Sequence, residues 1–340
     1  EAASDDPDAV NPDHVLELLR YPKRPVQQMA ADAFLPLVTA HPESGIPAVS
    51  RIAYLLRSFD IEDSSEASES EAVAFAETLL LSLARIAGVA PEKALTARRE
   101  VMEFLDDPNG PLAAPASICV AQFVETGSAG FITHIDTFEA LLNADSPAVR
   151  RNGAHILTQI SSSHPAAAVS AVPSLSDHLT DSDAQTAKKS AVALGLIARV
   201  DSEAVAETIP ALAEALDADE RGLRANAAGA LADIAEAFPD AVGVQKEALL
   251  AHLDDESAPV RRNTAAAFAR LAAADTDLAG AGERGLIELL DDPDVTVRAM
   301  ACQALGNFDS PVAEELLRTT AADDDSRAVR QAAKRALGRA

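Results

Sequence analysis

The sequence predicts an all-α solenoid of about nine helical hairpins wound into a right-handed superhelix. One motif recurs along its 340 residues: an acidic turn, an apolar or β-branched residue, a cation, and an alanine-rich run. The apolar or β-branched residue falls at Val26, Phe75, Leu112, Val149, Thr186, Leu223, Val260, Val297 and Val329. Most steps between these positions are 37 residues long. A fixed period of this size is typical of stacked helical repeats, each of which buries its apolar face against its neighbours.

This recurring residue opens the second helix of each expected hairpin, and later positions of that helix keep the same register. Large apolar side chains return eight and eleven residues after it, as in Leu231 and Ile234 of one repeat and Phe268 and Leu271 of the next. The fourth residue after it is mostly small, for example Ala227. Positions 0, 4, 8 and 11 lie on one side of an α-helix, so we expect them to face the core.

Proline marks both helices of the repeat. Four prolines stand at one position behind the second helix and should end it: Pro42, Pro91, Pro165 and Pro239. A shorter amphipathic helix precedes each second helix, as in residues 168–179 and 207–216, and Pro173 and Pro210 share a position near its start. Two helices per repeat predict about eighteen helices and no strand.

The period is interrupted in few places, which defines the expected domain organisation. Residues 1–10 form an acidic N-terminal lead-in, and residues 11–340 a single continuous solenoid that opens with an Asn11 cap and Pro12. A polar, acidic, Ser-rich loop insertion at residues 59–71 lengthens the second repeat. We interpret it as a disordered hydrophilic loop, with a regulatory or partner-gripping loop as the alternative. The shortened last repeat fits a C-terminal cap.

The charge balance is strongly acidic. Asp and Glu outnumber Lys and Arg by 54 to 28, the net charge is −26, and only six of the cations are Lys. This composition resembles the proteins of salt-accumulating halophilic archaea; the alternative is an acidic surface that serves one basic ligand. The acidity makes nucleic acid an unlikely partner, because nucleic-acid binding depends on neutralising phosphates with cations.

Cysteine content and hydropathy indicate the kind of environment in which the protein is expected. Cys119 and Cys302 lie 183 residues apart in alanine-rich helices, where we expect small buried side chains rather than a disulfide. No run of about 18 apolar residues occurs, so we expect no membrane span. We expect a cytoplasmic location. Because the sequence starts at Glu1 rather than Met, a removed signal peptide stays an alternative.

Two stretches resemble HEAT repeats: residues 289–308 (LLDDPDVTVRAMACQALGNF) and residues 215–235 (ALDADERGLRANAAGALADIA). The resemblance is to short HEAT repeats, also found in phycobilisome-lyase-like proteins, and it extends over nearly the whole chain. The period of 37 is shorter than the ~40–47 residues usual for HEAT and armadillo units. The resemblance implies a scaffold or adaptor that binds a protein partner on a concave wall of second helices.

The resemblance also raises enzymatic alternatives, which the residues do not favour. Deoxyhypusine-hydroxylase-like HEAT enzymes hold iron with His-Glu dipeptides, and none of the seven His here precedes a Glu. Bilin lyases need a pigment pocket, and HEAT-like DNA glycosylases use cations and aromatic residues, of which the latter make up only 4% of this chain. Zinc spacings, phosphate-binding loops and dinucleotide motifs are also missing. We therefore expect no enzyme, no metal and no cofactor.

Cations open successive second helices, where the positive end of the helix dipole disfavours them. The acidic turns just before these helices offer compensating carboxylates, within a repeat or between repeats. We therefore predict an Arg–Asp ladder that clamps the stack. Its members are Arg150, Arg224, Arg261 and Arg298 with Asp145, Asp181, Asp219, Asp255 and Asp292.

The neighbouring positions of the same first turns point elsewhere around the helix and form a basic track. Its members are Arg151, Asn152, Lys188, Lys189, Asn226, Arg262 and Asn263. On a strongly acidic protein, such a track is suited to an acidic peptide or a phosphate-bearing ligand, and a solvated face is the alternative. The sequence therefore predicts a non-enzymatic scaffold that binds a protein partner at this track. The alternative is a solenoid that binds nucleic acid or a phosphate ligand there.

The net charge of −26 predicts that salt stabilises the fold. At low ionic strength the carboxylates repel one another without screening, since the Debye length is about 10 Å at 0.1 M salt and about 3 Å at 1 M. We expect the helical circular dichroism signal and the thermal midpoint to rise between about 0.1 M and about 3 M KCl. Identical signals and midpoints at both concentrations would contradict the interpretation as a salt-adapted protein.

Overall fold

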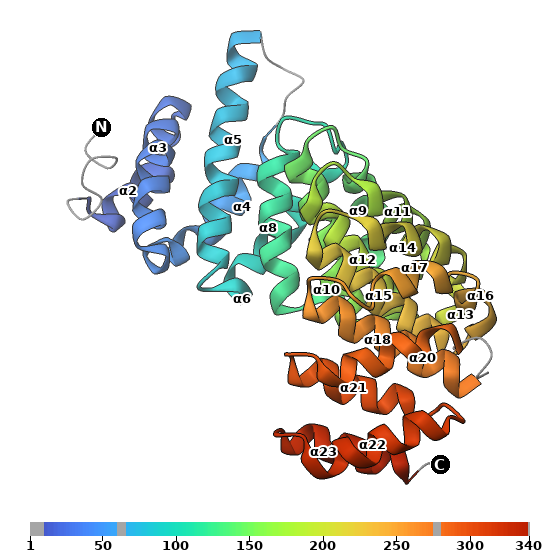
Figure 1. Cartoon of the computed structure of the whole chain (residues 1–340). Helices are drawn as coiled ribbons and strands as arrows, with labels where there is room; N and C mark the ends of the chain where they lie inside the picture. The colour runs from blue at the N-terminus through green and yellow to red at the C-terminus, as the bar shows by residue number, and fades with distance from the viewer. Residues whose placement is uncertain (1–9, 60–65, 275–279, 339–340) are drawn as a thin grey trace. The chain divides into compact units, whose positions relative to one another are not determined.

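The structure is a computed structural model that describes residues 10–59, 66–274 and 280–338 (Figure 1). Contacts divide the chain into two compact units, Glu1–Ser163 (unit 1) and His164–Ala340 (unit 2). In each unit the described residues form helices joined by turns, with no strand. The predicted all-α solenoid is thereby confirmed, whereas a single continuous domain stays a prediction.

Unit 1 holds four helical hairpins within its described residues, each with a first and a second helix; η denotes a 3₁₀ segment. The first helices are α2 (Pro12–Leu19), η2 and α4 (Pro42–Ala48, Val49–Arg57), α6, η3, α7 and η4 (Pro91–Ala94, Leu95–Ala97, Arg98–Met102, Glu103–Leu105), and η5 and α9 (Ser128–His134, Ile135–Leu142). The second helices are α3 (Arg24–Ala40), α5 (Glu66–Ala87), α8 (Ala113–Thr126) and α10 (Pro147–Ser163). Each second helix packs against the next one along the chain.

Unit 2 holds five hairpins in the part of the chain that is described. The first helices are η6, α11 and η7 (Pro165–Ala171, Val172–Asp177, His178–Thr180), α13, η8, α14 and η9 (Ser202–Val205, Ala206–Thr208, Ile209–Glu214, Ala215–Asp217), α16 and α17 (Pro239–Gly243, Lys246–Ala251), η10, α20 and η11 (Gly280–Gly282, Glu283–Glu288, Leu289–Asp291), and α22 (Pro311–Asp323). The second helices are α12 (Ala184–Ala198), α15 (Arg221–Ala235), α18 (Ala258–Ala274), α21 (Val295–Leu305) and α23 (Arg327–Leu337). These also pack in chain order.

Several second helices begin where an acidic side chain caps their first turn. The Asp183 carboxylate accepts the Thr186 amide at 2.9 Å, and the Asp294 carboxylate accepts the Thr296 amide at 2.7 Å. Such a cap satisfies an otherwise unpaired amide and places negative charge at the positive end of the helix dipole. The acidic turns seen in the sequence therefore start the helices that follow them.

Most first helices are broken into short α and 3₁₀ segments, whereas the sequence pattern predicted one continuous amphipathic helix. Proline is one cause. Pro210 is the second residue of α14, and the 3₁₀ segment η8 lies just before it. Because proline has no amide hydrogen to continue the α-helical bonds, the chain tightens into 3₁₀ geometry before it. Pro173 takes the same place in α11, after η6.

The predicted apolar stripe of the second helices is buried. Leu231 and Ile234 of α15 and Phe268 and Leu271 of α18 are fully inaccessible. Small residues allow these helices to approach closely: a Cβ atom placed on Gly195 of α12 would lie 3.6 Å from the Cβ atom of Ala230. Burial of this stripe is the main source of cohesion between neighbouring repeats.

Half of the predicted loop insertion at residues 59–71 is helical, because α5 begins at Glu66. Its sequence, EASESEAV, alternates Glu and Ala, which are strong helix formers, with Ser, and its acidic residues favour a helix N-terminus. Helix propensity thus outweighed the polar composition that suggested a loop. Residues 60–65 of the insertion and residues 1–9 of the lead-in lie outside the described residues.

Cys119 and Cys302 are buried free thiols, as expected from their alanine-rich surroundings. The Cys119 thiol donates to the Leu80 carbonyl at 3.0 Å. Burial raises the pKa of the Cys302 thiol to about 12, so it carries no reactive thiolate near neutral pH. Across the described residues, no helix combines the length and apolar character that crossing a bilayer requires.

Candidate protein-interaction site

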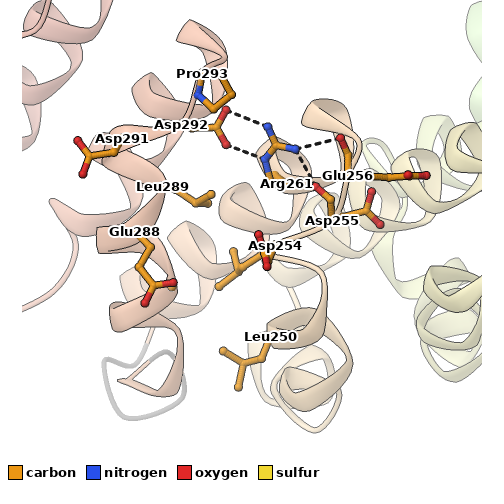
Figure 2. Close-up of a pocket in the computed structure, with 12 residues that line it drawn as sticks. Leu250, Asp254, Asp255, Glu256, Arg261, Glu288, Leu289, Asp291, Asp292 and Pro293 are labelled. Carbon is orange, nitrogen blue, oxygen red and sulfur yellow. Dashed lines mark hydrogen bonds and ion pairs between the residues drawn. The ribbon is translucent and has the colours of Figure 1, made fainter.

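The Arg–Asp ladder runs between repeats, and Arg261 of α18 shows its geometry. Arg261 Nη1 donates to the carbonyls of Asp255 and Glu256 in the turn before its own helix, at 2.7 and 3.2 Å. The Nε and Nη2 groups donate to the two carboxylate oxygens of Asp292 in the next repeat, at 2.6 and 2.9 Å (Figure 2). The two side chains are only 12% and 4% exposed. One guanidinium therefore holds its own turn and the following repeat together.

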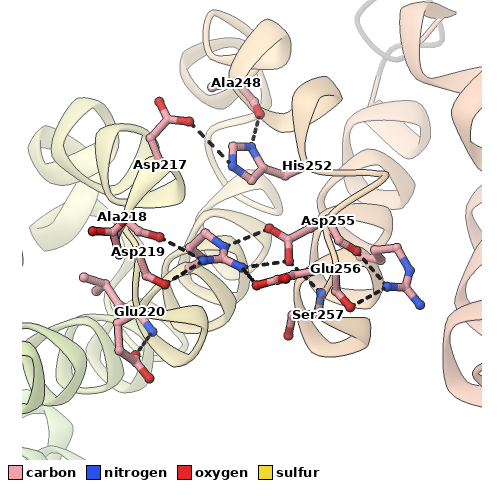
Figure 3. Close-up of polar contacts among 12 residues, drawn as sticks. Asp217, Ala218, Asp219, Glu220, Ala248, His252, Asp255, Glu256 and Ser257 are labelled. Atoms are coloured by element: carbon pink, nitrogen blue, oxygen red, sulfur yellow. Dashed lines mark hydrogen bonds and ion pairs between the residues drawn. The ribbon is translucent and has the colours of Figure 1, made fainter.

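Arg224 and Arg298 repeat this arrangement. Arg224 donates to the carbonyls of Ala218 and Asp219 and to the carboxylate of Asp255 in the next repeat, at 2.8 and 3.1 Å (Figure 3). Arg298 donates to the carbonyls of Asp292 and Pro293 and to the carboxylate of Asp324, at 2.8 and 3.2 Å. The planar guanidinium matches a carboxylate with two parallel bonds, which makes these pairs strong and well oriented.

The aspartate of each rung also braces the turn in which it stands. Oδ1 of Asp255 accepts the Ser257 amide at 2.7 Å, and Oδ1 of Asp292 accepts the Asp294 amide at 2.8 Å. Burial acts to raise the pKa of Asp255, but the bonds from Arg224 and Ser257 outweigh it, and the pKa lies below its ordinary value. The bond from Arg298 lowers the pKa of Asp324. Both carboxylates are therefore held in their charged form.

The structure brings together only part of the predicted ladder. Of the rungs it shows, two consist of predicted residues on both sides, Arg224 with Asp255 and Arg261 with Asp292. Arg298 pairs with Asp324, which the sequence analysis missed because the last step of the period is shorter than the others. Arg150 donates to the carbonyls of Ala144 and Asp145 at 3.0 Å, as the other ladder arginines do to the turns before their own helices.

The predicted aspartates Asp145 and Asp219 are wrong by one position. The residue that accepts the arginine in the other rungs lies five residues before the start of the repeat, and Ala144 and Ala218 occupy it. Asp145 and Asp219 offer backbone carbonyls to Arg150 and Arg224 instead. Asp181 does stand at this position and accepts the Asp183 amide at 2.6 Å.

Where one rung is missing in unit 2, both of its members are alanine. Ala187 stands where Arg224, Arg261 and Arg298 stand in later repeats, and Ala218 stands where the accepting aspartate is expected. Unit 1 shows the same joint replacement at Ala113 and Ala144. Losing both partners costs far less than leaving one buried charge without its partner. The alanine pairs are thus consistent with the ladder as a set of matched pairs.

The basic track is divided between the two units. Arg151 and Asn152 lie on α10 in unit 1, and Lys188 and Lys189 on α12 in unit 2; Asn226 lies on α15, and Arg262 and Asn263 on α18. The structure therefore does not define one continuous surface for all seven residues.

The asparagines of the track contribute to packing between second helices. Asn263 Nδ2 donates to the Ala225 carbonyl of the preceding second helix at 2.7 Å, and Asn226 Nδ2 donates to the Lys188 carbonyl at 3.3 Å. In unit 1, Asn152 Nδ2 donates to the Ser117 hydroxyl at 2.9 Å. Their amide groups are therefore engaged within the protein and connect neighbouring repeats.

A groove of about 380 Å³ crosses α12, α15 and α18 in unit 2 and includes Asn226, Arg262 and Asn263. Small residues, Gly195, Gly229, Ala225 and Ala266, line it together with Leu196 and Met300. Its charged residues are Arg199, Asp233, Arg262 and Arg270. This groove therefore contains three residues of the predicted track.

Arg262 differs from the other cations of the groove. Asp233 pairs with Arg199 at 2.8 Å and with Arg270 at 3.3 Å. Arg262 donates only to the side-chain carbonyl of Asn263, at 3.2 and 3.1 Å. No described carboxylate lies in ion-pair range of its guanidinium. Sequence reasoning missed Arg199, Asp233 and Arg270 because it searched only the first turns, although Asp233 and Arg270 share one position of their repeats.

The histidines do not assemble into a metal site. His155 lies 3.1 Å from Glu125, and His178 and His252 each contact a carbonyl of their own helical turn, at 2.7 and 2.8 Å. Among the described residues, no three His, Cys, Asp or Glu side chains converge as metal ligands would.

Comparison with known proteins supports the repeat architecture. Residues 283–340 match the family model of HEAT repeats. No curated protein matches the chain. Among solved structures, an engineered protein from the Northeast Structural Genomics Consortium is similar over 99% of this chain and 90% of its own, with a TM-score of 0.81 and 24% identity.

Two shorter structures are similar to part of the chain. A second engineered protein from that consortium covers 60% of this chain and 95% of its own, with a TM-score of 0.53 and 26% identity. A designed armadillo repeat protein covers 61% and 99%, with a TM-score of 0.52 and 23% identity. These likenesses show a helical repeat fold. They do not bear on the halophilic archaeal origin suggested by composition, which stays a prediction.

The ladder predicts strong coupling between its two members. Arg261→Ala leaves the Asp292 carboxylate almost fully buried without its cation, and we expect it to destabilise the protein by about 3 kcal/mol. The double variant Arg261→Ala/Asp292→Ala should lose less stability than the sum of the losses in the two single variants, by at least about 1 kcal/mol. Chemical denaturation measures all three. Arg284→Ala is the control, since Arg284 is 91% exposed; strict additivity would contradict the ladder.

The lowered pKa values of Asp255 and Asp324 predict a loss of stability in acid. A group whose pKa is lower in the folded than in the unfolded state stabilises the fold above the unfolded pKa of about 3.9. That contribution disappears as the pH falls through the folded pKa. We expect the stability advantage of the wild type over Asp255→Asn to be present at pH 6 and absent at very low pH. An advantage that does not change with pH would contradict this assignment.

Proposed function

We propose that this chain is a non-enzymatic scaffold that binds an acidic segment of a partner protein in the groove across α12, α15 and α18. The observation that carries the proposal is Arg262, a half-buried cation in that groove with no described carboxylate in ion-pair range. Helical repeat solenoids of the HEAT and armadillo kind are generally interaction scaffolds rather than enzymes.

The charge inventory of unit 2 supports an acidic ligand. Acidic residues exceed basic ones about twofold in the whole chain, yet Arg262 and Lys188 have no described ionic partner while Arg199 and Arg270 share Asp233. Lys188 lies on α12, and its backbone carbonyl accepts a hydrogen bond from the Asn226 amide of the next second helix. A cation left without a carboxylate on such an acidic protein is available to a carboxylate brought by a partner.

The shape of the groove supports a peptide segment as the ligand. Glycine and alanine along α12 and α15 leave space between the charged side chains, and Leu196 and Met300 add apolar surface. A segment that combines a carboxylate with an apolar side chain satisfies both parts. Met is adaptable and is common at peptide-binding surfaces. A nucleic acid fits less well, since it requires a row of cations and stacking aromatic residues.

The same proposal assigns Asn226 and Asn263 to supporting the helices that carry the groove. Arg151 and Asn152 lie in unit 1, and their predicted contact with a partner, like that of Lys189, stays a separate prediction. The acidic composition favours a cytoplasm rich in salt as the working environment. At such salt concentrations binding depends on short-range, desolvated contacts, because attraction between charges that are further apart than about 3 Å is screened at 1 M salt.

Charge reversal tests the proposal. We expect the wild-type chain to capture a small number of stoichiometric proteins from lysate of the source organism at native salt, with and without nuclease. Arg262→Glu should reduce that capture by at least about tenfold, because it replaces an attractive contact with a repulsive one. Arg284→Glu makes the same change of charge at a 91% exposed side chain and should leave capture unchanged. Capture that nuclease abolishes, or that survives Arg262→Glu, would contradict the proposal.

A further inference from the structure

The last described second helix, α23, carries more cations than the other described second helices. Its sequence, RAVRQAAKRAL, contains four cations and no carboxylate. Lys334 and Arg335 lie in its last turn, where the helix dipole favours cations. Arg327 and Arg330 lie in its first turn, where the dipole disfavours them. The dipole therefore accounts for only two of the four cations.

Arg330 makes the turn half of a ladder rung. It stands at the position of Arg224, Arg261 and Arg298 in earlier repeats. Its Nη1 group donates to the carbonyls of Asp324 and Asp325, as the earlier arginines do to their own turns. These two bonds fix the guanidinium in the orientation seen in the complete rungs.

Within the described residues, Arg330 lacks the carboxylate half of the rung. Arg224, Arg261 and Arg298 direct Nε and Nη2 to an aspartate, and no described carboxylate takes that place beside Arg330. The edge of the guanidinium that recognises a carboxylate is thus oriented but unoccupied by any described side chain. Three internal copies of the same arrangement show what that edge binds.

The residue one helical turn after Arg330 is also a cation, unlike its counterparts in the earlier repeats. Ala228, Ala265 and Cys302 stand four residues after the ladder arginines and are buried, whereas Lys334 stands four residues after Arg330 and is exposed. Like charges four residues apart destabilise a helix by about 0.2–0.5 kcal/mol. In α23, two neighbouring cations thus stand where the earlier second helices have one arginine and one small buried residue.

We propose that the face of α23 bearing Arg330 and Lys334 binds an acidic segment of a partner protein. One carboxylate of that segment makes the bidentate pair with Arg330 and a second approaches Lys334. This surface is separate from the groove of α12, α15 and α18, so it does not depend on the function proposed above.

A second copy of this chain is a poor occupant. If copies stacked head to tail, the turn that opens the first repeat would meet α23. That turn reads RYPKRP and carries Arg20, Lys23 and Arg24. Tyr21 stands there at the position of the rung aspartate. Cations would then face cations, which like-charge repulsion disfavours.

The test uses the full chain and a fluorescein-labelled peptide of alternating Asp and Ala residues as the probe, with an Asn-for-Asp peptide as its control. Fluorescence anisotropy measures affinity. We expect Arg330→Ala to weaken binding at least about fivefold and Arg330→Lys to weaken it severalfold, since lysine keeps the charge but loses the bidentate fork. Arg327→Ala is the matched control and should change affinity less than about twofold, because Arg327 makes no turn bonds.

A site-specific readout separates this surface from the groove. In protein with ¹⁵N-labelled arginine, the Nε–H signal of Arg330, assigned through Arg330→Lys, should shift on addition of the Asp peptide. The signals of Arg224, Arg261 and Arg298 should stay in place, because their Nε groups are already bonded to carboxylates. Absence of peptide binding, an unmoved Arg330 signal, or equal losses in Arg327→Ala and Arg330→Ala would overturn the proposal. A change in peptide affinity caused by Arg262→Glu would test the groove and would leave the shift expected for the Arg330 signal unchanged.

Discussion

The arginine at the start of the second helix is the interaction on which the stacking register depends. A cation is unfavourable at a helix N-terminus, and this chain compensates for it in two ways. The guanidinium closes its own turn through two carbonyls and reaches the aspartate of the next repeat, which in turn caps its own turn. Apolar burial holds neighbouring helices together without direction, whereas a bidentate pair fixes their relative positions.

The same chemistry distinguishes two kinds of partly buried arginine in unit 2. Arginines whose two donor edges are both filled, such as Arg224 and Arg261, belong to the architecture. Arg262 and Arg330 are held in place by bonds to uncharged groups and keep donor capacity for a carboxylate from outside. A partly buried guanidinium that is held in place without a described carboxylate is the feature on which both proposals rest.

Much of the fold follows from the 37-residue period, because the buried positions of a helix repeat with the helix itself. The stripe of Leu231, Ile234 and Phe268 is predictable for that reason. The breaks in the first helices are not, since short 3₁₀ segments depend on local packing around residues such as Pro210. The rung aspartates were partly misassigned because several acidic residues stand close together in each turn. In one turn the rung position is Ala218, and Asp217 and Asp219 lie on either side of it. The role of Asn263 was not predictable, because its acceptor is a backbone carbonyl of another helix.

Amide hydrogen exchange of the native chain tests the central claim that Arg–Asp rungs, rather than apolar packing alone, fix the stack. Residues 219–224 open a repeat without a rung from the preceding repeat, whereas residues 256–261 and 293–298 open repeats that receive one from Arg224 and Arg261. The account predicts faster exchange in the first segment than in the other two. Opening it breaks only the pair that Arg224 makes with the next repeat, whereas opening either of the others disturbs both a received pair and a donated one. Equal protection of all three segments would contradict it.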